Sequence, residues 1–275
     1  MYSGIKTYDL CHQARSAIRG EWTAFDEKAR LWLASGFVTD MAGGHMVWLA
    51  GVDGCRAGWL AAFVCFEAER AVAWDARILA SVAQVLEDPR EPKFVAVDIP
   101  IGLLSEHVAG GRECDRGTRK AIGARRSSVF SPPIRSLLGA THFDEVRGKG
   151  LNQHSFGIVP KIAEVDAWIT PELQERVFES HPEMAFTRLL GSPMQHYKLK
   201  APGKQERREA LVAVYPGFED WLAYWRVPRS QAGLDDLFDA MVLSWTAWRR
   251  FKGIAVPIPE RPPRDERGLE MAIWS

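Results

Sequence analysis

The sequence has few cysteines and no closely spaced pair of them. Its four cysteines are Cys11, Cys55, Cys65 and Cys114, and no two of them form a CxxC motif. This spacing suggests neither a zinc ribbon nor a disulfide framework. We therefore interpret the cysteines as cytosolic thiols.

Long apolar runs and an excess of one charge are also missing. No run of about 18 apolar residues is present that could span a membrane, and the N-terminus lacks the continuous apolar segment of a secretory signal. We expect a soluble, cytoplasmic protein that does not engage a membrane. Lys plus Arg and Asp plus Glu both number 35, so binding of nucleic acid must come from local basic patches.

The composition is nevertheless that of a chain with a substantial core. The 275 residues are 47% hydrophobic and 11% aromatic, which favours one domain, residues 47–275. Residues 1–46 form an N-terminal extension that ends in Gly43, Gly44, His45 and Met46. The two glycine codons could encode a ribosome-binding site for a start at Met46. A native helical extension is the alternative, and mass spectrometry of the endogenous N-terminus distinguishes the two.

The hydrophobic pattern predicts an α/β fold. Short apolar or alternating runs between charged or glycine-rich turns indicate strands, and apolar residues at helical spacing indicate helices. The predicted order is three strands at 47–53, 58–66 and 71–77, a helix at 78–88, a strand at 93–100, a largely helical region at 104–172, a strand at 175–180, helices at 182–190, 203–215 and 234–251, and a closing strand at 268–274.

Five carboxylates lie at the ends of predicted buried elements. Asp53, Asp98 and Glu179 each end a strand, and Asp236 and Asp239 are three residues apart on one face of the helix at 234–251. The carboxyl ends of strands in open α/β sheets line the crevice where ligands bind. We therefore expect these five acids to form one site.

A group of acids that repel one another is stable mainly when a cation neutralises it. Oxygen ligands suit Mg²⁺ or Mn²⁺, and two such ions about 4 Å apart can stabilise the attacking and leaving oxygens of a phosphodiester. We expect Asp53, Asp98, Asp236 and Asp239 to be the metal ligands, with Glu179 completing the site. The alternative is that each acid has a separate role, such as a turn, a helix cap or a buried ion pair.

Two basic segments could follow a phosphate backbone beside this site. Residues 112–126 carry six Arg or Lys against two acidic residues, and residues 198–208 carry five against one. The alternative for each is a solvated helix face. The candidate substrate contacts are Arg119, Arg125, Arg126, Ser127, Ser128, Lys161 and His181. For Lys161 an ion pair with Glu164 or Asp166 is the alternative, and for His181 a turn with a satisfied imidazole.

Six stretches of the sequence, taken together, resemble a known family. They are GVDGCRAGW (51–59), AVDIPIGL (96–103), RECDRGTRKAIGARRSSVFSPP (112–133), FGIVPKIAEVDAW (156–168), FESHPEMAF (178–186) and LDDLFDAMVLSWTAWR (234–249). The family is a domain-of-unknown-function family of bacterial and archaeal proteins described as predicted RNase H-like nucleases. The motif DLFDAM also resembles the last acidic motif of RuvC-type resolvases.

The resemblance implies an RNase H-like fold. This is a mixed five-stranded sheet with its first three strands antiparallel, flanked by helices, here with a helical insertion around 104–172 between the fourth and fifth strands. Asp53 matches the acid of the first strand, Asp98 that of the fourth, and Asp236 with Asp239 the pair on the final helix. Glu179 matches an acid on a later strand.

These observations predict a metal-dependent nuclease that hydrolyses phosphodiester bonds of DNA or RNA with Mg²⁺ or Mn²⁺. Two alternatives stay open. The first is a phosphotransferase related to actin-like ATPases and sugar kinases, although Cys55-Arg56 follows Asp53-Gly54 where those proteins have a Thr/Ser-Gly phosphate loop. The second is a module that binds nucleic acid or protein without turnover. The oligomeric state is open.

Overall fold

The computed structural model describes residues 46–149, 151 and 153–275. Apart from Met46, the segment 1–46 that we predicted to be an extension lies outside the described residues, as does Cys11. The other three cysteines are free and buried. No helix in the described part of the chain is long and apolar enough to cross a membrane.

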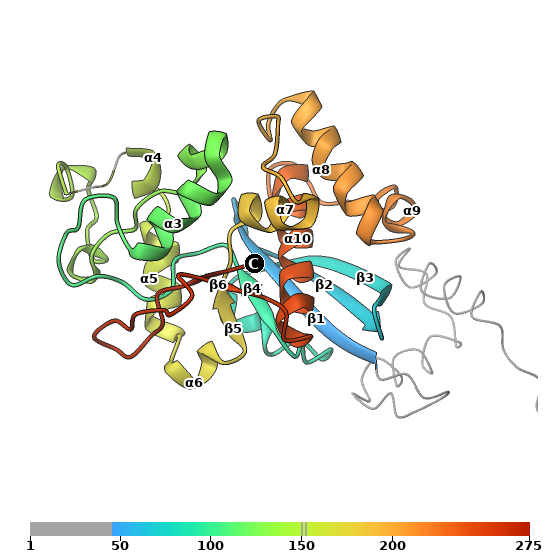
Figure 1. The fold of residues 1–275 in the computed structure, drawn as a ribbon, viewed down its shortest axis with the longest axis horizontal. Coiled ribbons are helices and arrows are strands. Elements are labelled where there is room, and N and C mark those ends of the chain that lie inside the picture. The colour runs from blue at the N-terminus through green and yellow to red at the C-terminus, as the bar shows by residue number, and fades with distance from the viewer. Residues whose placement is uncertain (1–45, 150, 152) are drawn as a thin grey trace, which may run out of the picture.

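The centre of the protein is a mixed sheet of five strands in the order β3-β2-β1-β4-β5 (Figure 1). The strands are β1 (Met46–Cys55), β2 (Gly58–Glu67), β3 (Arg70–Leu79), β4 (Val95–Val97) and β5 (Val177–Glu179). The first three strands pair antiparallel, whereas β4 runs parallel to both β1 and β5. This confirms the predicted mixed sheet with three antiparallel strands at its start.

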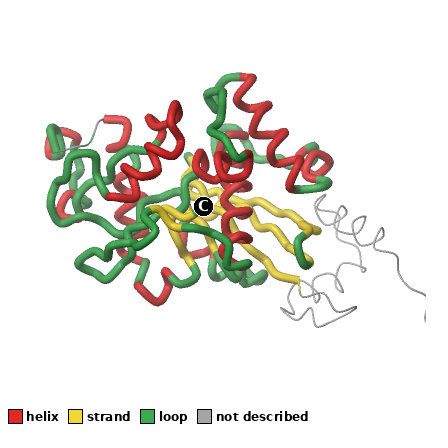
Figure 2. Tube along the Cα trace, viewed as in Figure 1, coloured by secondary structure: helices red, strands yellow, loops and turns green. Residues whose placement is uncertain are grey.

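Helices connect and cover the strands (Figure 2). The α-helices are α3 (Glu113–Ile122), α4 (Gln153–Phe156), α5 (Val159–Trp168), α6 (Pro171–Gln174), α7 (Pro182–Leu190), α8 (Ala201–Val214), α9 (Phe218–Leu222) and α10 (Leu234–Phe251). The 3-10 helices are η1 (Val82–Val85), η2 (Gly123–Ser128), η3 (Arg135–Leu137) and η4 (Phe143–Glu145). The predicted helical region between the fourth and fifth strands thus holds α3 to α6 and η2 to η4.

Two predicted elements take another form. The helix expected at 78–88 is wrong, because β3 pairs with β2 as far as Leu79 and only the short helix η1 follows. Val82 and Val85 of η1 are buried against the sheet, which explains their apolar spacing. The closing strand is only β7 (Ile273–Trp274), and it pairs with β6 (Pro257–Ile258) in a separate two-stranded sheet.

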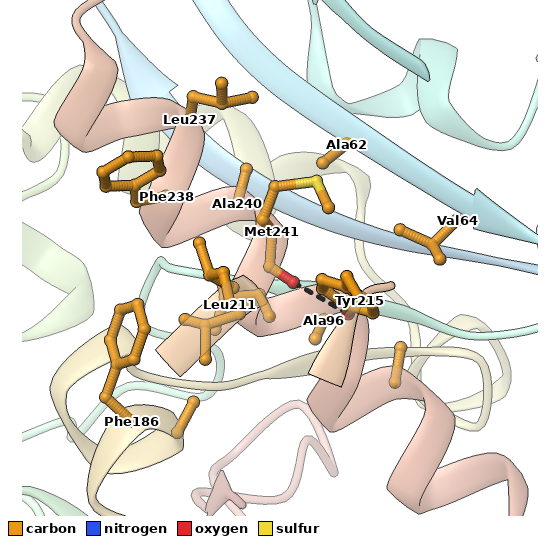
Figure 3. Close-up of a cluster of buried hydrophobic side chains, with 14 of the residues drawn as sticks. Ala62, Val64, Ala96, Phe186, Leu211, Tyr215, Leu237, Phe238, Ala240 and Met241 are labelled. Carbon is orange, nitrogen blue, oxygen red and sulfur yellow. Dashed lines mark hydrogen bonds between the residues drawn. The ribbon is translucent and has the colours of Figure 1, made fainter. Parts of the chain in front are cut away.

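Side chains of successive strand residues point to opposite faces of the sheet, so each face has its own core. Ala50 and Val52 of β1 pack with Ile162 and Val165 of α5 on one face. Leu49 packs on the other face, which α7, α8 and α10 cover. Figure 3 shows this second core, where the hydroxyl of Tyr215 donates to the carbonyl of Met241 at 3.1 Å.

The backbone of helix α10 packs directly against the backbone of β1, because residue 51 is a glycine. A Cβ at Gly51 would lie 2.0 Å from the carbonyl oxygen of Ala240 and 2.4 Å from the amide nitrogen of Ser244. Both are backbone atoms, so neither can rotate away. The close contact fixes the height of α10 above β1, and it brings the residue next to Ala240 over the end of that strand.

Gly51→Ala is expected to lower the free energy of unfolding by about 1–3 kcal/mol, the usual cost of overpacking, because α10 would have to move off the sheet. Urea unfolding monitored by tryptophan fluorescence measures the change. Gly139→Ala is the matched control, since a Cβ there meets nothing within 4 Å. Equal stability of the two variants would contradict the close packing of α10 on β1.

Candidate functional site

Asp53 and Asp98 lie on neighbouring parallel strands at the same level. In the ladder between β1 and β4, Val52 is opposite Val97, and the amide of Asp98 donates to the carbonyl of Val52 at 2.9 Å. Asp53 and Asp98 are the next residues on each chain, on the same face as Gly51 and therefore towards α10. Two carboxyl groups are thus side by side at the carboxyl ends of two central strands.

Asp239 of α10 is the third member of this group. It precedes Ala240, whose carbonyl lies over Gly51, and only 2% of its surface is exposed. Its charge raises the pKa of both Asp53 and Asp98. The structure therefore brings together an acid from β1, an acid after β4 and an acid from the last helix.

The proton affinities of the two strand acids reflect this crowding. Burial raises the pKa of Asp53 well above its ordinary value, and the charges of Asp98 and Asp239 raise it further. Burial and the charge of Asp239 raise the pKa of Asp98 to about 7. Without a cation, ionising both acids is unfavourable.

Lys198 provides one positive charge at this site, and the sequence did not single it out. Its ammonium donates to Oδ2 of Asp239 at 2.6 Å, and it also interacts with Asp53 and Asp98. Asp239 raises the pKa of Lys198, so the side chain stays charged. The pattern predicted only a basic segment at 198–208, in which the role of one lysine cannot be distinguished.

Asp236 lies at the edge of the group. One turn before Asp239 on α10, it is partly buried, and its carboxylate accepts the amide hydrogen of Gly233 at 2.7 Å. Burial raises its pKa, whereas the bond from Gly233 lowers it. Asp236 caps its own helix and has the weakest of the carboxylate effects on Asp53.

Glu183 is a further acid near the site that the sequence did not reveal. It is 6% exposed, and one carboxylate oxygen accepts from Arg207 at 2.5 Å. Its other oxygen, Oε2, is buried without a hydrogen-bond partner among the described residues. The charge of Glu183 raises the pKa of Asp98. The charge of Asp239 raises the pKa of Glu183, and that of Lys198 lowers it.

His181, a predicted substrate contact, is the residue before α7 and is two positions from Glu183. Its Nε2 is 3.4 Å from the carbonyl of Ser128, and its buried Nδ1 has no partner in the described part of the chain. Burial lowers the pKa of His181. The charges of Glu183 and Asp239 raise this pKa, and that of Lys198 lowers it. His181 is therefore a neutral side chain at the edge of the carboxylate group.

Glu179 lies apart from the other predicted acids. It is opposite Val97 in the parallel ladder and so faces away from α10, whereas Phe178 faces the core under α10. Its two oxygens accept from Arg112 at 2.6 and 2.8 Å, and one also accepts from the amide of Ile101. Glu179 is half of a buried ion pair.

The basic side chains of 112–126 are mostly engaged within the protein. Arg119 donates to the carbonyls of Gly110 and Val129, and Arg125 donates to those of Met194 and Gln195. The remaining predicted contacts of this segment, Arg126, Ser127 and Ser128, are exposed, although the hydroxyl of Ser128 donates to the carbonyl of Arg125.

Lys161 of α5 makes neither of the ion pairs considered for it. Its ammonium donates to the carbonyl of Gly58 at 2.5 Å and lies over the ring of Trp59. Glu164 instead accepts from the indole of Trp59. Lys161 is also close to Gly54, the residue after Asp53. A Cβ at Gly54 would lie 3.0 Å from Cδ of Lys161.

No three Asp, Glu, His or Cys side chains of the described residues are arranged as a ready-made metal site. An oxygen of Asp239 is occupied by the ammonium of Lys198. Three carboxylates and the ammonium of Lys198 thus lie in one group, in which negative charge exceeds positive charge when all three acids are ionised.

A family model for proteins of unknown function, DUF429, matches residues 51–264. The chain therefore belongs to the DUF429 family. No curated protein and no solved structure matches it.

Proposed function

We propose that this protein is a metal-dependent nuclease with an RNase H-like fold, in which Asp53, Asp98 and Asp239 hold Mg²⁺ or Mn²⁺. The observation that carries the proposal is the position of Asp53 and Asp98, side by side on β1 and β4 with Asp239 above them. The strand order β3-β2-β1-β4-β5 supports the fold. On this basis, α3 to α6 are the helical insertion.

The donor set suits the proposed ion. Three carboxylates offer only oxygen ligands, which Mg²⁺ and Mn²⁺ prefer. Oε2 of Glu183 is buried and unpartnered among the described residues, so it is a further oxygen that a cation or its water shell could use. Such buried, unsatisfied acceptors are costly unless a ligand engages them.

A divalent ion bound there would supply the Lewis acid that activates water and polarises a phosphoryl oxygen. The chain supplies the rest of the site. Asp53 and Asp98 would hold the ion at the carboxyl ends of two strands, and α10 holds Asp239 in place. The exposed Arg126 and Ser127 directly precede Ser128, whose carbonyl is 3.4 Å from Nε2 of His181, and they are candidate contacts to the phosphate backbone of DNA or RNA.

The test is cleavage of single-stranded, double-stranded and branched DNA and RNA with Mn²⁺. Asp53→Asn is expected to reduce cleavage by on the order of 100-fold or more, since metal ions contribute several kcal/mol to such reactions. Asp235→Asn is the matched control on the first turn of α10 and is expected to keep its activity.

Cleavage that survives both Asp53→Asn and Asp98→Asn would refute the assignment. Binding of ATP in calorimetry, without cleavage of any nucleic acid, would instead favour the phosphotransferase alternative. Heat from neither metal nor ATP would favour a binding module without turnover.

A further inference from the structure

Lys198 is held in the carboxylate group by its own loop. The loop between α7 and α8 is fixed where the amides of Gln195 and His196 donate to Glu206 at 2.7 and 2.9 Å. From the other side, Arg125 donates to the carbonyl of Gln195. Lys198 therefore reaches Asp239 from an anchored segment rather than from a free surface chain.

The start of α8 closes against the same loop. A Cβ at Gly203 would lie 2.1 Å from the carbonyl oxygen of Tyr197, so only glycine permits this approach. Arg207 donates to the carbonyl of His196 and pairs with Glu183. The residue before Lys198 is thus packed against α8, and 34% of the lysine side chain is exposed to solvent.

Two acids near the site are each stabilised by a partner of their own. Glu183 is balanced by Arg207, and Asp236 caps the positive N-terminal end of α10. Asp53, Asp98 and Asp239 remain, with Lys198 as their counter-charge. Carboxylates that bind a metal ion are deprotonated. Three negative charges and one positive charge then give a net negative charge that one divalent ion neutralises.

We propose that Lys198 takes the place of a second metal ion, so that this site binds one divalent cation beside a permanent ammonium. The inference rests on the proposed function and refines it. Asp53, Asp98 and Asp239 hold the ion, and Lys198 occupies Oδ2 of Asp239, which a second ion would need.

The test is Mn²⁺ binding to the full chain, with stoichiometry from calorimetry and the nature of the site from electron paramagnetic resonance. The wild type is expected to bind one ion with the spectrum of an isolated Mn²⁺. Lys198→Met is expected to bind two, with the spectrum of a coupled pair. Lys198→Arg keeps the charge and is expected to bind one, as is Lys200→Met, which removes an exposed lysine of the same loop.

Two ions in the wild type would overturn this inference and leave the proposed function intact. A single ion of unchanged affinity in Lys198→Met would also overturn it. No Mn²⁺ binding to the wild type would overturn the proposed function itself. Circular dichroism of each variant shows whether it is folded, and Lys198→Arg tests the role of charge without removing a long side chain.

Discussion

Arg112→Met is expected to lower the free energy of unfolding by about 3–5 kcal/mol, the usual cost of removing one partner from a buried ion pair. Arg112 is 1% exposed and pairs with both Asp115 and Glu179 at 2.7 and 2.6 Å. Its guanidinium also donates to the carbonyls of Ile101 and Gly102. The substitution leaves two buried carboxylates without a counter-charge. Urea unfolding measures the loss.

Arg147→Met is the matched control. Arg147 pairs with Asp144, but the two side chains are 69% and 80% exposed, so the expected loss is less than about 1 kcal/mol. Equal losses in the two variants would contradict the structural role of Arg112.

Glu179→Gln separates the two roles considered for Glu179. As half of an ion pair with Arg112, it is expected to lose stability and to keep Mn²⁺ binding. Loss of Mn²⁺ binding at unchanged stability would instead make Glu179 a member of the metal site.

The position of Glu179 could have been anticipated from the alternation of its strand. In VFE the aromatic Phe178 faces the core under α10, so its neighbour Glu179 must face the other way. The prediction used only the position of Glu179 at the end of a strand. The end of a strand places an acid at the edge of the sheet where ligands bind. Which face of the sheet the acid lies on depends on the alternation of side chains along the strand.

Asp53 and Asp98 illustrate what the sequence does convey. Each follows a compact apolar run that forms a central strand, and parallel pairing of β1 with β4 then brings the two acids to one level. Local strand patterns together with the family resemblance predicted the mixed five-stranded sheet and its three antiparallel strands, but not the order of the strands. The pattern at 78–88 failed because burial of Val82 and Val85 against the sheet produces the same spacing as a helix.

Lys198 and Glu183 could not be found in this way. Both reach the site from the segment around α7 and α8, where the chain has no strand pattern to fix its position. The position of Lys198 depends on the hydrogen bonds from Gln195 and His196 to Glu206, which join residues 11 and 10 positions apart. Such contacts depend on tertiary packing and leave no periodic signal.

Asp98→Asn is expected to stabilise the protein in EDTA while weakening Mn²⁺ binding by more than about 10-fold, a loss that even outer-shell changes can cause. Burial and Asp239 raise the pKa of Asp98 from its ordinary value of 3.8 to about 7. The folded protein thus binds this proton more tightly than the unfolded chain. Ionised Asp98 therefore costs stability that grows as the pH rises from about 4 to about 7. Asparagine removes this cost, which is on the order of 4 kcal/mol at pH 8.

Thermal unfolding in EDTA at pH 5 and pH 8 checks the sign, and the gain of Asp98→Asn over wild type should be larger at pH 8. The exposed Asp220 on α9 provides the control, because Asp220→Asn should change stability by no more than about 0.5 kcal/mol at either pH. A variant less stable than wild type at pH 8 would mean that Asp98 is held by partners that favour its charge. A variant that is more stable but binds Mn²⁺ more weakly is the result expected if these acids are placed together for a cation, since an acid kept only for the fold would not lower the stability of the protein.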